Sequence, residues 1–162
     1  MQTGWSSHAP ARYLRKQGQI ELPPSLTNHY LATNVILPDE NVEMNVHDKI
    51  NYVEFPSKDL EETKKFFTAA FGWSFTDYGP EYSAFSNEGI DGGFFKSDQV
   101  STTKNGSALI VFYSIDLEAT LSRIENAGGS IVKPIFSFPG GRRFHFGDPN
   151  GNEYAVWSDL NV

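Results

Sequence analysis

Two segments of this sequence resemble each other closely in length and pattern. The stretch "DLEETKKFFTAAFG" begins at Asp59, and "DLEATLSRIENAGG" begins at Asp116, 57 positions later. Both runs carry apolar residues at helical spacing and end in glycine, so each predicts a helix. Each helix is preceded by one apolar stretch and followed by three more. The order strand, helix, strand, strand, strand therefore occurs twice, which predicts an α+β fold built from two duplicated modules, residues 48–98 and 105–160.

Local signals place the elements of each module. Glu62 follows Asp59 by three residues, the spacing of a capping box, and Gly72 provides the left-handed residue that ends a helix. The strand before this helix is expected to end at Pro56. In the first module the strands are predicted in "INYVEF", "WSFTDY", "EYSAFS" and "GGFF"; in the second they are "SALIVFYSI", "SIVKPIFSF", "RRFHF" and "EYAVWS".

A single module of this kind would leave one face of its sheet bare. Two modules side by side are expected to form a curled mixed sheet around a concave cavity, with the helices outside. Aromatic residues make up 14% of the chain, which favours either an aromatic-rich core or a ring-lined pocket. A concave, ring-lined cavity is typical of a small-molecule site.

Composition excludes several classes of function. The chain has 13 basic and 20 acidic residues, a formal charge of −7, which argues against nucleic acid or anionic membrane as a partner. It has no cysteine, so disulfides, thiol nucleophiles and thiolate metal sites are absent. No run of about 18 apolar residues and no secretory signal pattern occur. By elimination, we expect a cytoplasmic location.

Residues 1–47 differ from the rest, with two adjacent prolines and no sustained periodicity, and are read as an N-terminal extension before a domain at 48–162. One interpretation is a linker or leader, with the natural start near Met44. The other is an arm that packs apolar residues on the body or on a partner subunit; these residues are Tyr30, Leu31, Val35, Ile36 and Leu37.

The motifs "NYVEFP" with "DLEETKKFFTAAFGW", the helix end "IENAGG" and the turn in "FGDPNGNEYAVW" resemble the vicinal oxygen chelate superfamily. This superfamily holds glyoxalase, bleomycin-resistance and dioxygenase proteins, and the likeness is to its glyoxalase-related branch. The resemblance implies the paired-module fold, a small-molecule ligand and a homodimer. It leaves open whether modules pair within one chain or between two.

In metal-using members of that superfamily, the first and last strands of each module supply the metal ligands. The corresponding positions here are Tyr52, Leu109 and Ala155, with a fourth position inside "GIDGGFF", where Asp91 is the single carboxylate. Aliphatic side chains cannot bind a metal, so we predict no resident metal and no cofactor. The alternative is a rebuilt metal site from Glu54, Glu153 and His145, with His47 nearby.

The sequence therefore predicts a metal-independent protein that binds, and thereby sequesters, a cationic or aromatic compound in the manner of bleomycin-resistance proteins. The alternative is a glyoxalase-related lyase or isomerase in which Glu54 and Glu153 act as acid and base, because facing carboxylates raise one pKa. A pure interaction module is a third class. The predicted ligand-binding residues are Tyr52, Glu54, Phe94, Leu109, Phe112, Arg142, His145, Glu153 and Trp157.

Overall fold

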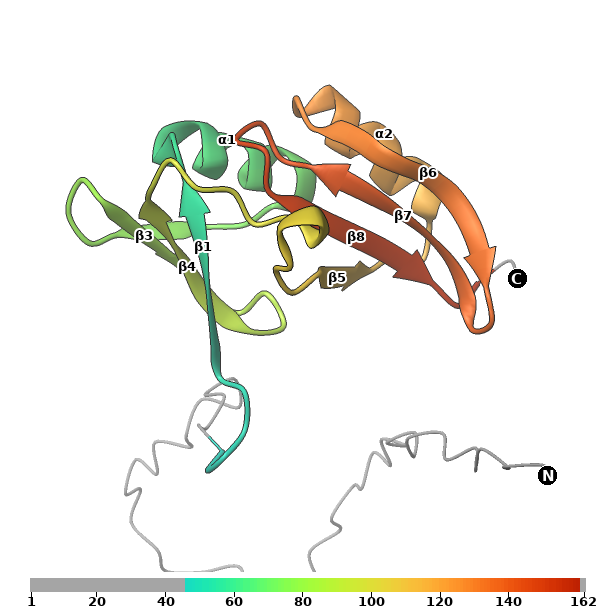
Figure 1. Ribbon diagram of the computed structural model, residues 1–162, viewed down its shortest axis with the longest axis horizontal. Coiled ribbons are helices and arrows are strands. Elements are labelled where there is room, and N and C mark those ends of the chain that lie inside the picture. The colour runs from blue at the N-terminus through green and yellow to red at the C-terminus, as the bar shows by residue number, and fades with distance from the viewer. Residues whose placement is uncertain (1–45, 161–162) are drawn as a thin grey trace, which may run out of the picture. The chain divides into compact units, whose positions relative to one another are not determined.

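The computed structural model describes residues 46–160, and Figure 1 shows two modules with the same order of elements. The first module contains β1 (Tyr52–Ser57), α1 (Leu60–Phe71), β2 (Phe75–Asp77), β3 (Tyr82–Phe85) and β4 (Asp91–Lys96). A short 3-10 helix, η1 (Thr103–Asn105), lies between the modules. The second module contains β5 (Ile110–Tyr113), α2 (Leu117–Asn126), β6 (Ser130–Phe138), β7 (Gly141–Gly147) and β8 (Glu153–Ser158). The predicted α+β class and duplicated module are confirmed.

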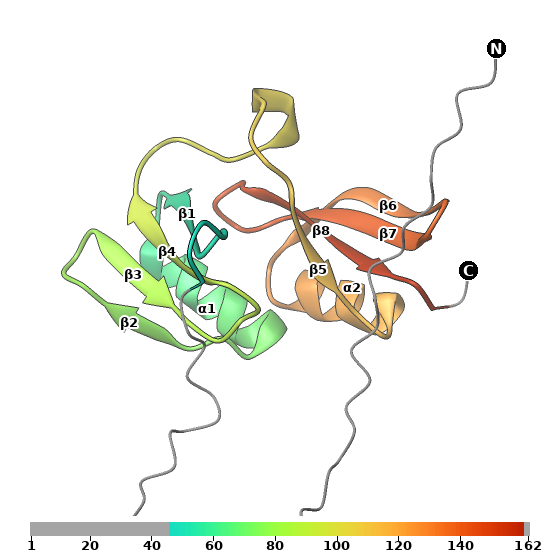
Figure 2. The same cartoon turned by 90° about the horizontal axis from the view of Figure 1, so that it is seen from below.

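Each module forms its own four-stranded mixed sheet. The strand orders are β1-β4-β3-β2 and β5-β8-β7-β6, with β1 parallel to β4, β5 parallel to β8, and antiparallel pairs elsewhere. β1 and β5 are therefore edge strands in equivalent places. Figure 2 shows both strands toward the middle of the two-module body. Within the described residues the two sheets remain separate and are not closed into a barrel.

The helix ends follow from their capping residues. The Asp59 side chain accepts from the Glu62 amide at 3.0 Å, and Asp116 accepts from the Ala119 amide at 2.9 Å. Each bond satisfies an amide that lacks a partner within its helix. Gly72 closes α1 at φ 79°, a conformation that glycine adopts without a Cβ clash.

The first strand extends beyond its predicted end. We expected it to stop at Pro56, but β1 continues to Ser57. Proline lacks an amide hydrogen, yet an edge strand tolerates it because one side of the strand has no ladder partner. On that side the carbonyl of Pro56 accepts from Asn152 Nδ2 at 2.8 Å. The proline therefore marks the edge of the sheet and not the end of the strand.

Aromatic rings from both modules form one core. Phe66 of α1 packs against Phe146 of β7, with ring centroids 6.2 Å apart, and Phe55 of β1 packs against Tyr154 of β8 at 5.4 Å. All four side chains are buried. Burying one such ring contributes about 1.5–3 kcal/mol, so this shared core is what holds the modules against each other.

Two asparagines of the turn before β8 strengthen the same junction. The Asp59 amide donates to Asn150 Oδ1 at 2.8 Å, and Asn150 Nδ2 donates to Thr63 Oγ1 at 3.0 Å. Asn152 Oδ1 accepts from the Ser101 amide at 2.8 Å. The turn of the second module thus holds the start of α1 in the first.

None of the helices among residues 46–160 is long and apolar enough to cross a membrane. The predicted extension lies outside the described residues except for its last two positions. The arm residues Tyr30, Leu31, Val35, Ile36 and Leu37, and Met44 as a start, fall in the part that the structure does not describe.

Candidate functional site

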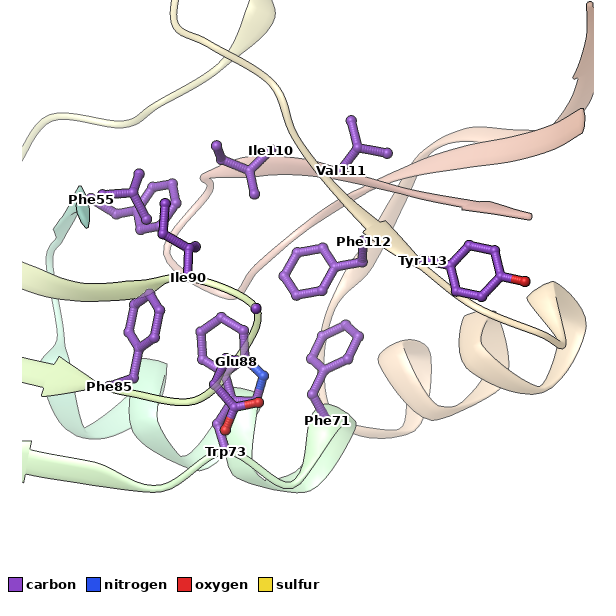
Figure 3. A pocket seen from close by; sticks show the side chains of 12 residues that line it. Phe55, Phe71, Trp73, Phe85, Glu88, Ile90, Ile110, Val111, Phe112 and Tyr113 are labelled. Carbon is purple, nitrogen blue, oxygen red and sulfur yellow. The ribbon is translucent and has the colours of Figure 1, made fainter. Parts of the chain in front are cut away.

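An apolar cavity of about 460 Å³ lies beside the edge strands β1 and β5, and we call it the slot (Figure 3). Its walls come from both modules: β1, the C-terminal end of α1, the β3–β4 turn and all of β5. The lining residues are Val53, Phe55, Phe71, Trp73, Phe85, Glu88, Gly89, Ile90, Ile110, Val111, Phe112 and Tyr113.

Stacked rings form one side of the slot. Phe71 and Phe112 stack with centroids 4.7 Å apart and planes 16° from parallel. Trp73 lies 5.8 Å from Phe112 and 4.4 Å from Phe85. Figure 3 shows these rings opposite Ile90 and Ile110. Aromatic rings that line a cavity offer flat, polarisable faces, which favour a flat aromatic ligand or a cation.

Glu88 is the single carboxylate among the lining residues. Burial raises the pKa of the Glu88 carboxyl above its usual value of 4.5, because a low-dielectric site disfavours the charged form. Within residues 46–160, Glu88 has no hydrogen-bond or ion-pair partner. A ligand cation would supply the missing counter-charge.

A second cluster lies on the first-sheet polar face, defined by Tyr52, Glu54, Tyr82 and Gly93. Tyr82 donates to Glu54 Oε1 at 2.9 Å, and the hydroxyls of Tyr52 and Tyr82 are 2.8 Å apart. Burial and these two neighbours raise the pKa of the Tyr82 hydroxyl far above its usual value of 10.0. Gly93 allows this arrangement, because a Cβ there would lie 2.1 Å from the Tyr82 hydroxyl oxygen. Glu54 is thus already bonded within its own module.

The equivalent surface of the second module is the second-sheet polar face, defined by Lys133, Phe136, Arg143, His145, Glu153 and Trp157. His145 Nδ1 lies 2.8 Å from Glu153 Oε1, and both side chains are about nine-tenths buried. Glu153 Oε2 also accepts from the amide and hydroxyl of Thr103, at 2.8 and 2.7 Å. Burial acts to raise the pKa of Glu153, but the bonds from Thr103 and His145 outweigh it, so the pKa lies below 4.5.

The structure brings some predicted site residues together and separates others. Phe112 lines the slot, and His145 and Glu153 form a hydrogen-bonded pair. Tyr52 and Glu54 meet through Tyr82, but no hydrogen bond in the described chain connects either of them to Glu153. The lowered pKa of Glu153 is also opposite in direction to the rise expected for two facing carboxylates.

The remaining predicted residues lie elsewhere. Phe94 is fully buried in the core, and Leu109 is half-buried just before β5. Arg142 pairs with Glu118 of α2, and its neighbour Arg143 lies on the second-sheet polar face instead. Trp157 lines an adjacent open cleft. His47 is 95% exposed in its side chain and lies 3.3 Å from Asp48.

The residues present do not fit the metal site of the superfamily that the sequence resembles. The register pairs Glu54 with Gly93 in the first module and Val111 with Ala155 in the second. The equivalent of Ala155 is therefore Gly93 and not Asp91, whose side chain accepts from the Asn87 amide. The four equivalent positions are thus Tyr52, Gly93, Leu109 and Ala155. Among their side chains only that of Tyr52 has an oxygen that could bind a metal, and this hydroxyl is hydrogen-bonded to Tyr82. Residues 46–160 contain no group of three His, Cys, Asp or Glu side chains placed to hold a metal.

Sequence reasoning missed most of the slot. Strand alternation placed Tyr52 and Glu54 on the face assigned to the ligand, whereas Val53 and Phe55, on the other face of β1, line the slot. The slot opens on that other face because β1 and β5 are edges with no strand between them. Glu88 lies in the turn "NEGID", where its carboxylate carries no pattern that sets it apart from other polar turn residues.

Comparison with known proteins gives a consistent result. The model of the family described as "Glyoxalase/Bleomycin resistance protein/Dioxygenase superfamily" matches residues 49–156. The anthracycline biosynthesis protein DauV of Streptomyces sp. (strain C5) is 29% identical over 124 residues, which cover 65% of this chain and 45% of that protein. The chain thus spans about half the length of this curated relative.

Two solved structures share the fold. A glyoxalase-related enzyme from Fulvimarina pelagi aligns with a TM-score of 0.59 and 16% identity over 68% of this chain and 88% of that one. The fosfomycin resistance protein FosX from Listeria monocytogenes aligns with a TM-score of 0.58 and 20% identity, over 70% and 94% of the two chains. At these identities the likeness shows the fold alone.

Proposed function

Because this chain belongs to the Glyoxalase/Bleomycin resistance protein/Dioxygenase superfamily, we propose that it binds a flat aromatic small molecule carrying a positive charge. The ligand occupies the slot, and binding needs no resident metal. The observation that carries this proposal is the slot itself, whose lining combines aromatic rings with one carboxylate that has no partner among the described residues.

The size and chemistry of the slot support this class of ligand. About 460 Å³ is within the range of pockets that hold drug-sized molecules, roughly 300–1,000 Å³. The rings of Phe71, Trp73 and Phe112 can pack on an aromatic face, and ring pairs contribute about 0.5–1.5 kcal/mol beyond area burial. Glu88 gives the preference for a cation, because ionising it alone in an apolar site is unfavourable.

The similarity to DauV agrees with this choice. That protein is described as an anthracycline biosynthesis protein, and anthracyclines are flat polycyclic aromatic compounds. A ligand of that chemical class suits a flat, ring-lined slot. The overlap covers 45% of DauV, so we carry over the shape of the ligand and no reaction.

The enzymatic alternative, with Glu54 and Glu153 as acid and base, has weaker support. Each carboxylate is already hydrogen-bonded, Glu54 to Tyr82 and Glu153 to His145 and Thr103. A lowered pKa makes Glu153 a poor proton acceptor near neutral pH. Turnover of any substrate by the Glu54→Gln, Glu153→Gln double variant would exclude this mechanism altogether.

The test uses 2-naphthylmethylammonium as a cationic probe and 2-naphthylmethanol as its neutral counterpart. Calorimetry of the wild type should show tighter binding of the cation. Ile90→Trp fills the slot and should weaken both probes by about tenfold or more, which is about 1.4 kcal/mol. Ile115→Trp makes the same change at a side chain 72% exposed and should leave binding intact.

Glu88→Gln separates charge from shape. It should reduce the preference for the cation over the neutral probe by about three- to tenfold, with the neutral probe unchanged. Unchanged binding of both probes in Ile90→Trp would refute the slot as the site. A tightly held stoichiometric divalent metal in the purified protein, needed for probe binding, would refute metal independence.

A further inference from the structure

Two side-chain nitrogens on the second-sheet polar face are buried without a hydrogen-bond partner among residues 46–160. They are Nε of Arg143 and Nε2 of His145, two positions apart on β7. Leaving such a group buried and unpaired is unfavourable by about 1–3 kcal/mol. Two of them on the same face of one strand suggest that something outside the described chain bonds to them.

The partners of His145 determine what its free nitrogen can do. Glu153 is held as a carboxylate by the bonds from Thr103, and a carboxylate can only accept. Nδ1 of His145 must therefore be the nitrogen that donates to Glu153 Oε1. Nε2 is left to share a proton with a ligand, either by accepting from an acidic O–H or by donating once it is protonated.

Arg143 offers a cation that no carboxylate in the described chain neutralises. Its guanidinium lies 5.2 Å from the Phe136 ring centroid and 5.3 Å from that of Phe138. Arg142, one residue earlier, points to the other side of the sheet and pairs with Glu118. These two rings hold the Arg143 guanidinium in place and leave its donors for a ligand, and a planar guanidinium matches the two oxygens of a carboxylate.

Lys133 adds a second unpaired cation to the same face. It lies opposite His145 in the β6–β7 register, and its Nζ is 3.8 Å from the Phe136 ring centroid. No carboxylate lies within ion-pair distance of it in the described residues. A chain with a formal charge of −7 thus gathers Lys133, Arg143 and His145 around one ring.

An open cleft of about 400 Å³ adjoins this cluster, and Val111, Phe138, Gly140, Arg143 and Trp157 line it. Trp157 lies directly opposite Arg143 in the β7–β8 register. We propose that the second-sheet polar face is a separate binding site for an aromatic carboxylate, whose carboxyl group contacts Arg143 and His145 while its ring packs between Trp157 and Phe138.

This site differs from the slot in position and in charge. Val111 is the single residue that lines both, and it does so because the edge strand β5 borders the two cavities. The slot has one carboxylate and should prefer cations, whereas the second site has Arg143, Lys133 and His145 and should prefer anions. A result for cation binding in the slot therefore does not decide whether the second-sheet polar face binds an anion.

The test uses 2-naphthoate and its neutral counterpart 2-naphthamide, followed by NMR of the full chain. Naphthoate should bind at least about tenfold more tightly than the amide, and it should shift the Trp157 indole and the His145 Nε2 resonances. Arg143→Gln should abolish this preference, and Lys133→Gln should reduce it by a few fold. Lys65→Gln, an equal loss of charge at an exposed position of α1, should leave it unchanged.

A stability measurement keeps the result interpretable. Arg143→Gln should unfold cooperatively in thermal denaturation, as the wild type does, which shows that the variant is folded. The proposal is overturned if naphthoate binds no better than naphthamide, or if Arg143→Gln retains the preference. It is also overturned if Ile90→Trp, and not Arg143→Gln, removes naphthoate binding, because the anion would then occupy the slot.

Discussion

Ser57 and Thr63 in the first module make the same hydrogen bond as Ser114 and Thr120 in the second, each 2.8 Å long. The two pairs are 57 positions apart, as are the capping residues Asp59 and Asp116. In each module this bond joins the end of the edge strand to the first turn of the helix. The two modules therefore keep one framework of caps and hydroxyl pairs.

The polar faces of the two sheets differ, although they rest on that common framework. The first carries tyrosine hydroxyls and the carboxylate of Glu54, whereas the second carries Lys133, Arg143 and a histidine held by Glu153. None of the residues named on these two faces belongs to the hydrophobic core, so they can change without altering the fold. The two modules thus share a backbone framework but differ in the charge and hydrogen-bonding groups on their polar faces.

The module junction also uses the duplicated hydroxyls in different ways. Thr63 accepts from Asn150 of the second module, whereas Thr120 accepts from Arg123 Nη2 at 2.9 Å. Arg123 Nε then donates to the Ala70 carbonyl of the first module at 3.3 Å. The Thr63 hydroxyl therefore accepts a bond from the other module directly, whereas the Thr120 hydroxyl bonds to Arg123, which in turn bonds to the other module. The two modules thus contribute differently to their junction.

The largest expected effect tests whether the modules are one folding unit. Phe66→Ala removes a ring that is 1% exposed and packs against Phe146, and it should lower the free energy of unfolding by about 3–5 kcal/mol. Urea unfolding followed by fluorine NMR of fluorotryptophan reports on Trp73 and Trp157 separately. Both signals should move to the same lower midpoint; a shift confined to Trp73 would show that the modules unfold independently.

A smaller loss of stability is expected from a substitution that distinguishes the two polar faces. Glu153→Gln replaces a carboxylate that accepts three hydrogen bonds and should lower the free energy of unfolding by about 1–3 kcal/mol at neutral pH. The amide can donate to Nδ1, so Nε2 of His145 should become the protonated nitrogen, visible in long-range nitrogen–proton NMR spectra. Glu54→Gln, on the other face, should leave the His145 spectrum unchanged.

The pH dependence of the same variant follows from the lowered pKa of Glu153. A carboxyl whose pKa is lower in the folded state stabilises the protein above its ordinary pKa of 4.5 and loses that contribution as the pH falls through the folded-state value. The stability gap between wild type and Glu153→Gln should therefore be full near pH 7 and close below pH 4.5. A gap that stays constant down to pH 3 would contradict the charged hydrogen bonds.

The smallest expected effect compares the duplicated hydroxyls directly. Ser57 is fully buried, so Ser57→Ala should lower the free energy of unfolding by about 0.5–1.5 kcal/mol. Ser114 is half-buried, and water can replace part of its bonding, so Ser114→Ala should cause a smaller loss. Thermal denaturation of both variants and of the double variant measures the difference. A larger loss for Ser114→Ala would show that the second module depends more on this bond.

Local patterns predicted the elements well, since caps and alternation act over a few residues. Asp59, Asp116 and Gly72 bound the helices as expected, and β6 and β8 match their predicted ranges. Pro56 was misread because its tolerance depends on β1 being an edge strand, which is a property of the sheet. Which of Arg142 and Arg143 lies on the polar face also required the observed register, because alternation alone separates the two without assigning either.

The duplicated order of strands and helices, its caps and the lack of donors at Leu109 and Ala155 could all be read from the sequence, because each depends on residue type and spacing. The slot, the Tyr82–Glu54 bond and the His145–Glu153 pair required the tertiary structure. The residues of each of these three features come from different strands or turns. Strand pairing and the packing of the shared aromatic core bring them together. Sequence specified the scaffold, whereas the arrangement of the edge strands β1 and β5 determined where the apolar cavity lies.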